Sequence, residues 1–142
     1  MTGNSLLRRQ FRYEYFNAAL ILIAVNGGFF LLRTLAPARV IYTFAMIPAR
    51  VARDGALWQL FSYMFIHADL SHLFFNMLGL YFFGTQIERR MGSREFLLFY
   101  LVCGFAAGVF SFAAYWFSGA YLVVLLGASG AVYAVLLAFA VY

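Results

Sequence analysis

Charged residues are scarce in this chain of 142 residues: they make up 11% of it, and every basic residue is an arginine. By contrast, 65% of the residues are hydrophobic and 21% are aromatic. A soluble domain of this length cannot bury that much apolar surface, so the composition predicts an integral, multi-pass membrane protein. The net charge of +5 comes from arginines that flank apolar runs. Flanking arginines are typical of membrane anchoring, and nucleic acid is not expected as a partner.

The sequence lacks the residues that several kinds of site require. The single cysteine, Cys103, excludes an internal disulfide, and its apolar surroundings indicate a packing residue rather than a reactive thiol. There is no H-E-x-x-H motif for a zinc protease and no glycine-rich phosphate loop. No aspartate lies within an apolar run, which excludes a paired-aspartate protease for this segment.

Four uncharged apolar runs predict membrane spans, and therefore an all-α polytopic helical bundle. We expect the spans at about residues 16–32, 70–87 and 96–117, with a fourth that begins between about 122 and 129 and reaches 142. Hydropathy alone favours the earlier start for the fourth span. The cluster of small residues around Ser129 favours the later start, because it marks the beginning of a helix.

The polar segments between the spans predict the topology. Residues 1–15 form a basic arm, which shares one side of the membrane with the turn at residues 88–95, and together they hold six arginines. The positive-inside rule places that side in the cytoplasm. Residues 33–69 are too polar to span and too apolar for a flexible linker, so they predict a structured loop at the membrane surface. Its interfacial anchors are expected to be Trp58, Phe61, Tyr63 and Phe65.

Polar side chains in the second span are the first candidates for chemistry, because such residues are costly within a membrane. His72 and Asn76 are four residues apart, which places them on one face of a helix. His67 lies five residues before His72 and would point elsewhere on a regular helix. The three side chains can converge only if His67 precedes the helix. Taken singly, each of them is better interpreted as a hydrogen-bonding residue between helices, but as a spaced set beside a serine motif they indicate a site.

Ser129 is the candidate nucleophile, and it lies in a G-A-S-G motif that begins at Gly127. Small neighbours let the backbone and a substrate approach closely. A serine at a helix amino terminus also has free backbone N–H groups and a favourable dipole beside it, which suits an oxyanion. Small residues at the interfaces of membrane helices produce the same motif, so the motif alone leaves a structural role open.

In combination, these motifs resemble those of the rhomboid family of intramembrane serine proteases. The resemblance rests on Trp58, the H-x-x-x-x-H-x-x-x-N spacing from His67 to Asn76, the E-R-R-M-G-S turn at residues 88–93, and the G-A-S-G motif at residues 127–130. It covers about residues 16–142, which would form a partial rhomboid domain with four of an expected six helices. It implies cleavage of transmembrane protein substrates within membrane lipid, with no metal and no cofactor, in a bacterial-type plasma membrane.

The resemblance also implies roles for single residues. Ser129 matches the nucleophile, and His72 and Asn76 match residues that line the oxyanion hole together with the Ser129 backbone N–H. His67 matches a residue that supports the local geometry. Tyr133, one turn after Ser129, matches an aromatic residue that packs against the catalytic histidine.

The sequence departs from the family pattern at two points. The family often has Trp-Arg in the first loop, where this chain has Trp58 followed by Gln59, so any loop contact made by that arginine is in doubt. The family's catalytic base is a histidine on a later helix, and no such histidine is present. We therefore expect an incomplete and, by itself, inactive chain of a Ser-His protease.

Two other functions compete with this hypothesis. The first is a non-catalytic rhomboid-like protein that binds transmembrane segments, which the missing base favours and the presence of Ser129 does not. The second is a small transporter that uses His72 and Asn76 as a polar relay, which leaves the G-A-S-G motif unexplained.

Overall fold

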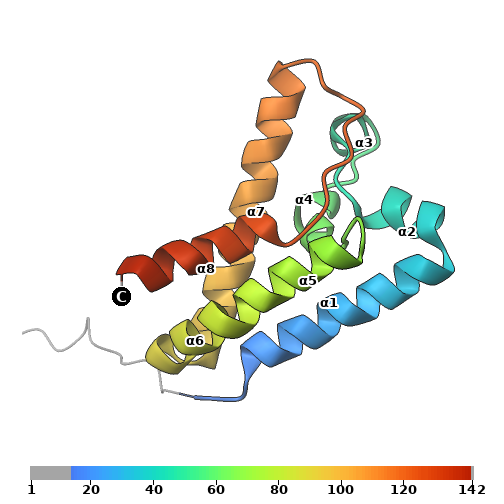
Figure 1. The fold of residues 1–142 in the computed structure, drawn as a ribbon. Coiled ribbons are helices and arrows are strands. Elements are labelled where there is room, and N and C mark those ends of the chain that lie inside the picture. Colours follow the sequence, from blue (N-terminus) through green and yellow to red (C-terminus); the bar gives the residue numbers. More distant parts are fainter. Residues whose placement is uncertain (1–13, 142) are drawn as a thin grey trace, which may run out of the picture.

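The computed structural model describes residues 14–141, which consist of helices and the loops that join them (Figure 1). The predicted basic arm falls almost wholly outside the described residues. Two helices, α1 and α7, are long and apolar enough to cross a membrane. The predicted fold class, an all-α membrane protein, is confirmed. The helices are α1 (Ala18–Leu35), α2 (Pro37–Phe44), α3 (Pro48–Arg53), α4 (Gln59–Ser62), α5 (Leu70–Gly79), α6 (Thr85–Met91), α7 (Ser93–Phe117) and α8 (Ser129–Val141).

The second apolar run forms one nearly continuous helix over residues 70–91, called the rod below. A π-helical turn, Leu80–Gly84, joins α5 to α6. The third run forms α7, which α8 crosses in Figure 1 and which α1 and α6 also contact. The fourth run is helical only from Ser129 onward, because residues 118–128 form an extended segment that returns along the loop between α1 and α5. The helix start that carries Ser129 thus lies beside the rod, where α8 contacts both α5 and α7.

Small residues allow α8 and the loop to approach α7 closely. A Cβ atom added at Gly130 would lie 2.6 Å from the Cβ atom of Ala107 on α7. One added at Gly108 would lie 2.4 Å from the carbonyl oxygen of Leu60 in α4. These short distances leave no room for a larger residue at Gly130 or Gly108. The loop and α8 therefore pack directly against α7.

A buried carboxylate connects the beginning of α1 to the end of α6. Glu88 is fully buried, and its two oxygens accept hydrogen bonds from the backbone N–H groups of Ala18 (2.6 Å) and Ala19 (3.0 Å). Ser93 donates its hydroxyl to the same carboxylate. The first N–H groups of a helix have no partner within the helix, and a negative charge there interacts favourably with the helix dipole.

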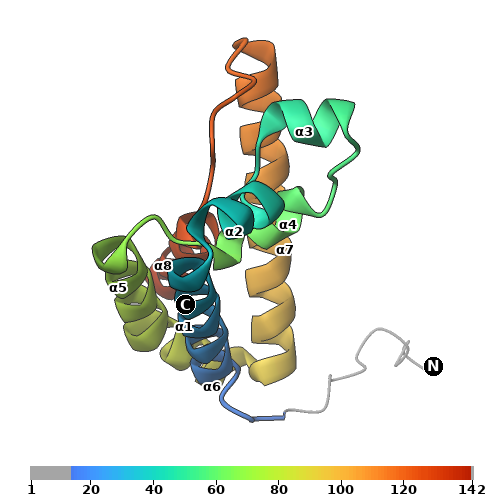
Figure 2. The same ribbon diagram turned by 90° about the vertical axis from the view of Figure 1, so that its right-hand side faces the viewer.

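The loop between α1 and α5 is structured: it contains α2, which packs on α1, and α3 and α4, which lie beside α7 (Figure 2). Trp58 and Phe61 are exposed on it, as expected for interfacial anchors. The expectation was wrong for Tyr63, which is buried with 3% of its surface exposed. Its hydroxyl donates to the carbonyl oxygen of Gly104 at 2.8 Å, so Tyr63 joins the loop to α7. An aromatic residue at an interface and one in a core look alike in a sequence.

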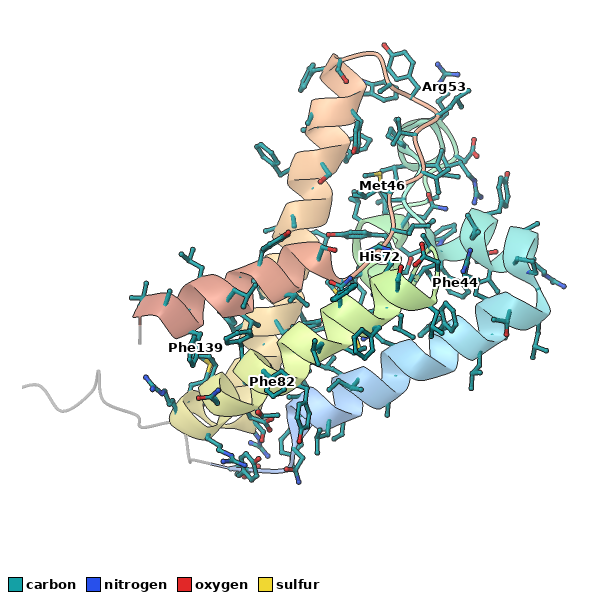
Figure 3. All side chains as sticks on the ribbon, in the orientation of Figure 1. Phe44, Met46, Arg53, His72, Phe82 and Phe139 are labelled. Atoms are coloured by element: carbon teal, nitrogen blue, oxygen red, sulfur yellow. The ribbon has the colours of Figure 1, made fainter. Side chains whose placement is uncertain are left out.

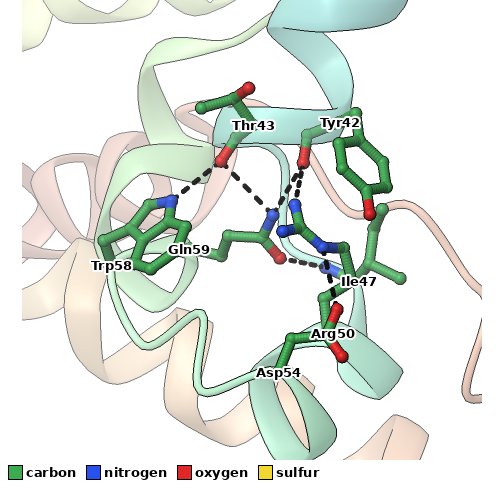
Figure 4. A network of polar contacts seen from close by, with 7 residues as sticks. All are labelled: Tyr42, Thr43, Ile47, Arg50, Asp54, Trp58 and Gln59. Carbon is green, nitrogen blue, oxygen red and sulfur yellow. Dashed lines mark hydrogen bonds and ion pairs between the residues drawn. The ribbon is translucent and has the colours of Figure 1, made fainter.

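The amide of Gln59 is the centre of this loop (Figure 4). Gln59 is fully buried, and its Nε2 donates to the carbonyl oxygens of Tyr42 (2.9 Å) and Thr43 (3.3 Å). Its Oε1 accepts from the backbone N–H of Ile47 at 3.1 Å. An arginine at residue 59 has no acceptor and would leave that N–H without its partner.

A cation is nevertheless present in this network, on α3. Arg50 donates to the Tyr42 carbonyl oxygen, and its guanidinium carbon lies 3.9 Å from the centroid of the Tyr42 ring. Arg50 also forms an ion pair with Asp54 at 3.3 Å. Trp58 donates its indole N–H to the Thr43 carbonyl oxygen at 2.8 Å. Gln59 and Arg50 thus both bond to the Tyr42 carbonyl oxygen and hold α2 against the rest of the loop.

We predict that Gln59→Arg destabilises the protein, even though the family often has arginine at this point. The substitution leaves the Ile47 N–H unpaired and places a second guanidinium beside Arg50, which we expect to lower the free energy of unfolding by about 1–3 kcal/mol. Unfolding in a denaturing detergent, followed by circular dichroism, measures the change. The matched control is Gln86→Arg, since Gln86 is exposed on α6 and only donates to the Phe82 carbonyl oxygen. Equal stability of the two variants would contradict the prediction.

Candidate active site

The first turn of α5 is fixed by its N-cap, Asp69. The Asp69 carboxylate accepts a hydrogen bond from the Ser71 hydroxyl at 2.6 Å and from the His72 backbone N–H at 2.8 Å. These two bonds lower the pKa of Asp69. Asp69 therefore stays ionised at neutral pH and caps the helix. Because α5 begins at Leu70, His67 lies in the loop before the helix, which is the arrangement that lets His67 and His72 converge.

The imidazole of His72 contacts the hydroxyl of Ser129. His72 Nε2 and Ser129 Oγ are 3.3 Å apart, although the residues are 57 positions apart in the sequence. In Figure 3, His72 lies where the amino-terminal ends of α5 and α8 meet. Gly127 permits this contact, because a Cβ atom at residue 127 would lie 2.5 Å from Cε1 and 2.6 Å from Nε2 of His72. Gly127 also has a φ of +112°, a conformation that side-chain-bearing residues rarely adopt.

A backbone donor favours one tautomer of His72. Its Nδ1 accepts a hydrogen bond from the Ala68 backbone N–H at 3.4 Å. In a neutral imidazole one nitrogen accepts and the other carries the proton, so this bond favours the tautomer of His72 with its proton on Nε2. In that tautomer His72 donates toward Ser129 Oγ. A donor at this place stabilises negative charge, and it cannot take a proton from the serine.

Asn76 lies one turn after His72 on the same face of α5. It is 6% exposed, and its Nδ2 donates to the His72 carbonyl oxygen at 2.9 Å. His72, Asn76 and Ser129 all line one cavity of about 330 Å³ between α5 and α8. Tyr133 also lines this cavity, with 71% of its surface exposed. The other lining residues are Ser71, Phe75, Gly79, Phe83, Val132 and Leu136.

His67 does not line the cavity and instead lies behind His72. The two rings meet edge to face with their centroids 5.1 Å apart. His67 is fully buried, and its Nε2 accepts from the Ala128 backbone N–H at 3.4 Å. The structure thus brings together the residues singled out in the sequence, and their catalytic roles stay predictions. Sequence reasoning did not find Ala68 and Ala128, because they act through backbone N–H groups that carry no sequence signal.

Within residues 14–141, no three His, Cys, Asp or Glu side chains lie close enough to share a metal ion.

Known proteins are similar to this chain in sequence. The family model described as the rhomboid domain matches residues 54–142. The chain belongs to the rhomboid family. It is 33% identical over 112 residues to the rhomboid protease GluP of Bacillus subtilis. The matched region covers 79% of this chain and 20% of GluP. It is 29% identical over 117 residues to the rhomboid protease GlpG of Pectobacterium atrosepticum, which covers 82% of this chain and 40% of GlpG.

Rhomboid relatives also occur outside bacteria. The mitochondrial RHOMBOID-like protein 12 of Arabidopsis thaliana is 33% identical over 94 residues, or 66% of this chain and 28% of that protein. The family predicted from the motifs is confirmed, and with it an integral membrane protein. This rhomboid chain spans between about one fifth and two fifths of the length of these relatives.

Proposed function

We propose that this rhomboid chain carries the nucleophile and the oxyanion hole of an intramembrane serine endopeptidase that cleaves transmembrane proteins. The observation that carries the proposal is the 3.3 Å contact between His72 Nε2 and Ser129 Oγ at the amino terminus of α8. A serine in ordinary helix packing needs no such partner. Two of the relatives, GluP and GlpG, are named as rhomboid proteases.

In the proposed reaction, Ser129 Oγ attacks the carbonyl carbon of the scissile peptide bond. A general base takes the hydroxyl proton, and the carbonyl π electrons move onto oxygen to form a tetrahedral oxyanion. The oxyanion collapses, the C–N bond breaks, and the base returns the proton to the leaving amine. Water then hydrolyses the acyl ester on Ser129, with the same base taking and returning a proton.

The oxyanion hole is proposed to consist of His72, Asn76 and the Ser129 backbone N–H. His72 donates from Nε2 because Ala68 occupies Nδ1. The Asn76 amide lines the same cavity, and the Ser129 N–H is one of the first N–H groups of α8, which have no partner within the helix. Donors that already point toward the developing charge lower the barrier without reorganisation in the transition state.

The general base is proposed to come from outside these 142 residues, on the later helix that the family resemblance implies. The chain has two histidines. His67 Nε2 already accepts a hydrogen bond from Ala128, and His72 Nε2 carries a proton in its assigned tautomer. Neither is arranged to take the Ser129 proton. Tyr133, at the exposed edge of the cavity, would pack against the incoming base.

The membrane lipid and transmembrane protein segments are the proposed partners. Phe75 and Tyr133 line the cavity with 69% and 71% of their surfaces exposed, and an apolar mouth of this kind suits a membrane-embedded substrate. The alternative is a rhomboid-like protein that binds transmembrane segments without cutting them, which the lack of a base among the 142 residues favours. The next experiment separates the two functions.

In the full-length protein, we predict that a fluorophosphonate probe labels Ser129 and that Ser129→Ala abolishes both labelling and cleavage of a transmembrane reporter. The reason is that a nearby base activates the hydroxyl. Ser118→Ala is the matched control, since Ser118 is exposed at the end of α7, outside the cavity, and the substitution is expected to leave labelling intact. Residues 1–142 alone are expected to show no Ser129-dependent cleavage. Cleavage by Ser129→Ala would remove Ser129 from the mechanism, and binding without any labelling would support the non-catalytic alternative.

We also propose that the turn between α6 and α7 faces the cytoplasm, because six of the ten arginines are on that side. In a Cys103→Ser background, an impermeant maleimide should label Leu57→Cys in intact cells, since Leu57 is exposed on the opposite loop. It should label Arg90→Cys, an exposed position on α6, only after the membrane is opened. Labelling of Arg90→Cys in intact cells would reverse the orientation.

A further inference from the structure

The segment that leads into Ser129 is held by the loop between α1 and α5. Met46 and Leu125 exchange two backbone hydrogen bonds of 2.9 Å each, as in an antiparallel sheet. The Ala49 N–H donates to the Tyr121 carbonyl oxygen, also at 2.9 Å. These contacts fix the distant part of the segment to the loop, so the position of the nucleophile depends on a structure that is far from it in sequence.

The contacts continue to the residues that directly precede the nucleophile. The Gly127 N–H donates to the Tyr63 carbonyl oxygen at 3.0 Å, and the Ala128 N–H donates to His67 Nε2 at 3.4 Å. In this series only the last contact is made by a side chain. It acts on the peptide bond between Gly127 and Ala128. Because glycine has wide backbone freedom, the orientation of that peptide depends on its hydrogen bonds.

His67 is suited to accept this bond at neutral pH. Burial, together with the charge that His72 can carry, lowers the pKa of His67 to about 4. A neutral imidazole with Nε2 as acceptor carries its proton on Nδ1, so the two histidines are held in opposite tautomers by two backbone N–H groups. Protonated His67 could not accept from Ala128. The titratable group that faces His67 is His72 on α5, at 5.1 Å between ring centroids, and Asp69 lies beyond it as the cap of that helix.

We propose that His67 is a positioning residue for the nucleophile: its Nε2 fixes the peptide between Gly127 and Ala128, and through it the direction of the Ser129 backbone N–H. Gly127, whose carbonyl group belongs to the same peptide, also packs against the His72 ring, so the orientation of this peptide affects the position of the ring. Loss of the bond would let the peptide rotate and misalign two of the three proposed oxyanion donors, the Ser129 backbone N–H and His72 Nε2. This inference rests on the proposed function and goes beyond it, since His67 touches neither the substrate cavity nor Ser129.

A pair of amide variants of the full-length protein tests the proposal. In His67→Gln, the side-chain oxygen is as many bonds from Cβ as Nε2 of histidine, so it can accept from Ala128. In His67→Asn, the oxygen is one bond closer to the backbone and cannot reach. We expect His67→Gln to keep kcat within about threefold of the wild type, and His67→Asn to lose about 10- to 100-fold in kcat with little change in KM.

A second measurement does not depend on activity. Hydrogen exchange at the Ala128 amide, followed by NMR, should be slow in the wild type and in His67→Gln, and faster in His67→Asn at equal thermal stability. Equal kcat in the two variants, or equal protection of Ala128 in all three proteins, would overturn the positioning role. A loss of kcat in both variants with a matching loss of stability would overturn it too, in favour of a packing role. Cleavage that survives Ser129→Ala would instead refute the proposed function itself.

Discussion

The position of Ser129 depends on a close approach between the start of α8 and the first turn of α5, which only glycine at residue 127 permits. A Cβ atom there would lie 2.5 Å from the His72 ring. Because glycine has no Cβ atom, His72 Nε2 lies 3.3 Å from Ser129 Oγ. The approach is supported from behind by α7, where Gly130 packs against Ala107 with no space for a larger residue. The hydrogen bonds made by Asp69, Ala68 and His67 fix the first turn of α5, the His72 ring and the peptide before Ser129.

The second constraint is the pair of backbone N–H groups that bond to one nitrogen of each histidine. Two histidines, 5.1 Å apart, could exchange roles if each were free to choose its protonated nitrogen. Backbone N–H groups prevent this: Ala68 occupies Nδ1 of His72 and Ala128 occupies Nε2 of His67. One imidazole thus becomes a donor toward the serine and the other an acceptor that holds the backbone. The loop between α1 and α5 supplies Ala68 and His67, so this loop is part of the site.

Composition and spacing were sufficient to predict the all-α membrane fold and the rhomboid family, because apolar length and a spaced set of rare polar residues survive in a sequence. Convergence of His67 with His72 was foreseen only on the condition that His67 precedes the helix. The helices inside the loop and the burial of Tyr63 were not foreseen, since short helices and buried aromatics in a mixed segment have no distinctive pattern. Contacts through Ala68 and Ala128 could not be predicted at all, because any residue except proline has the same N–H group.

The most direct test of this account is the protonation state of His72, measured by 15N NMR on histidine-labelled full-length protein near neutral pH. We predict that neutral His72 carries its proton on Nε2, with Nδ1 unprotonated. Ala68→Pro removes the backbone donor to Nδ1 and should shift the population toward the other tautomer. A wild-type His72 with its proton on Nδ1 would leave Nε2 as an acceptor facing Ser129. In that case His72 would be placed as a general base, and the division of roles between the two histidines would be contradicted.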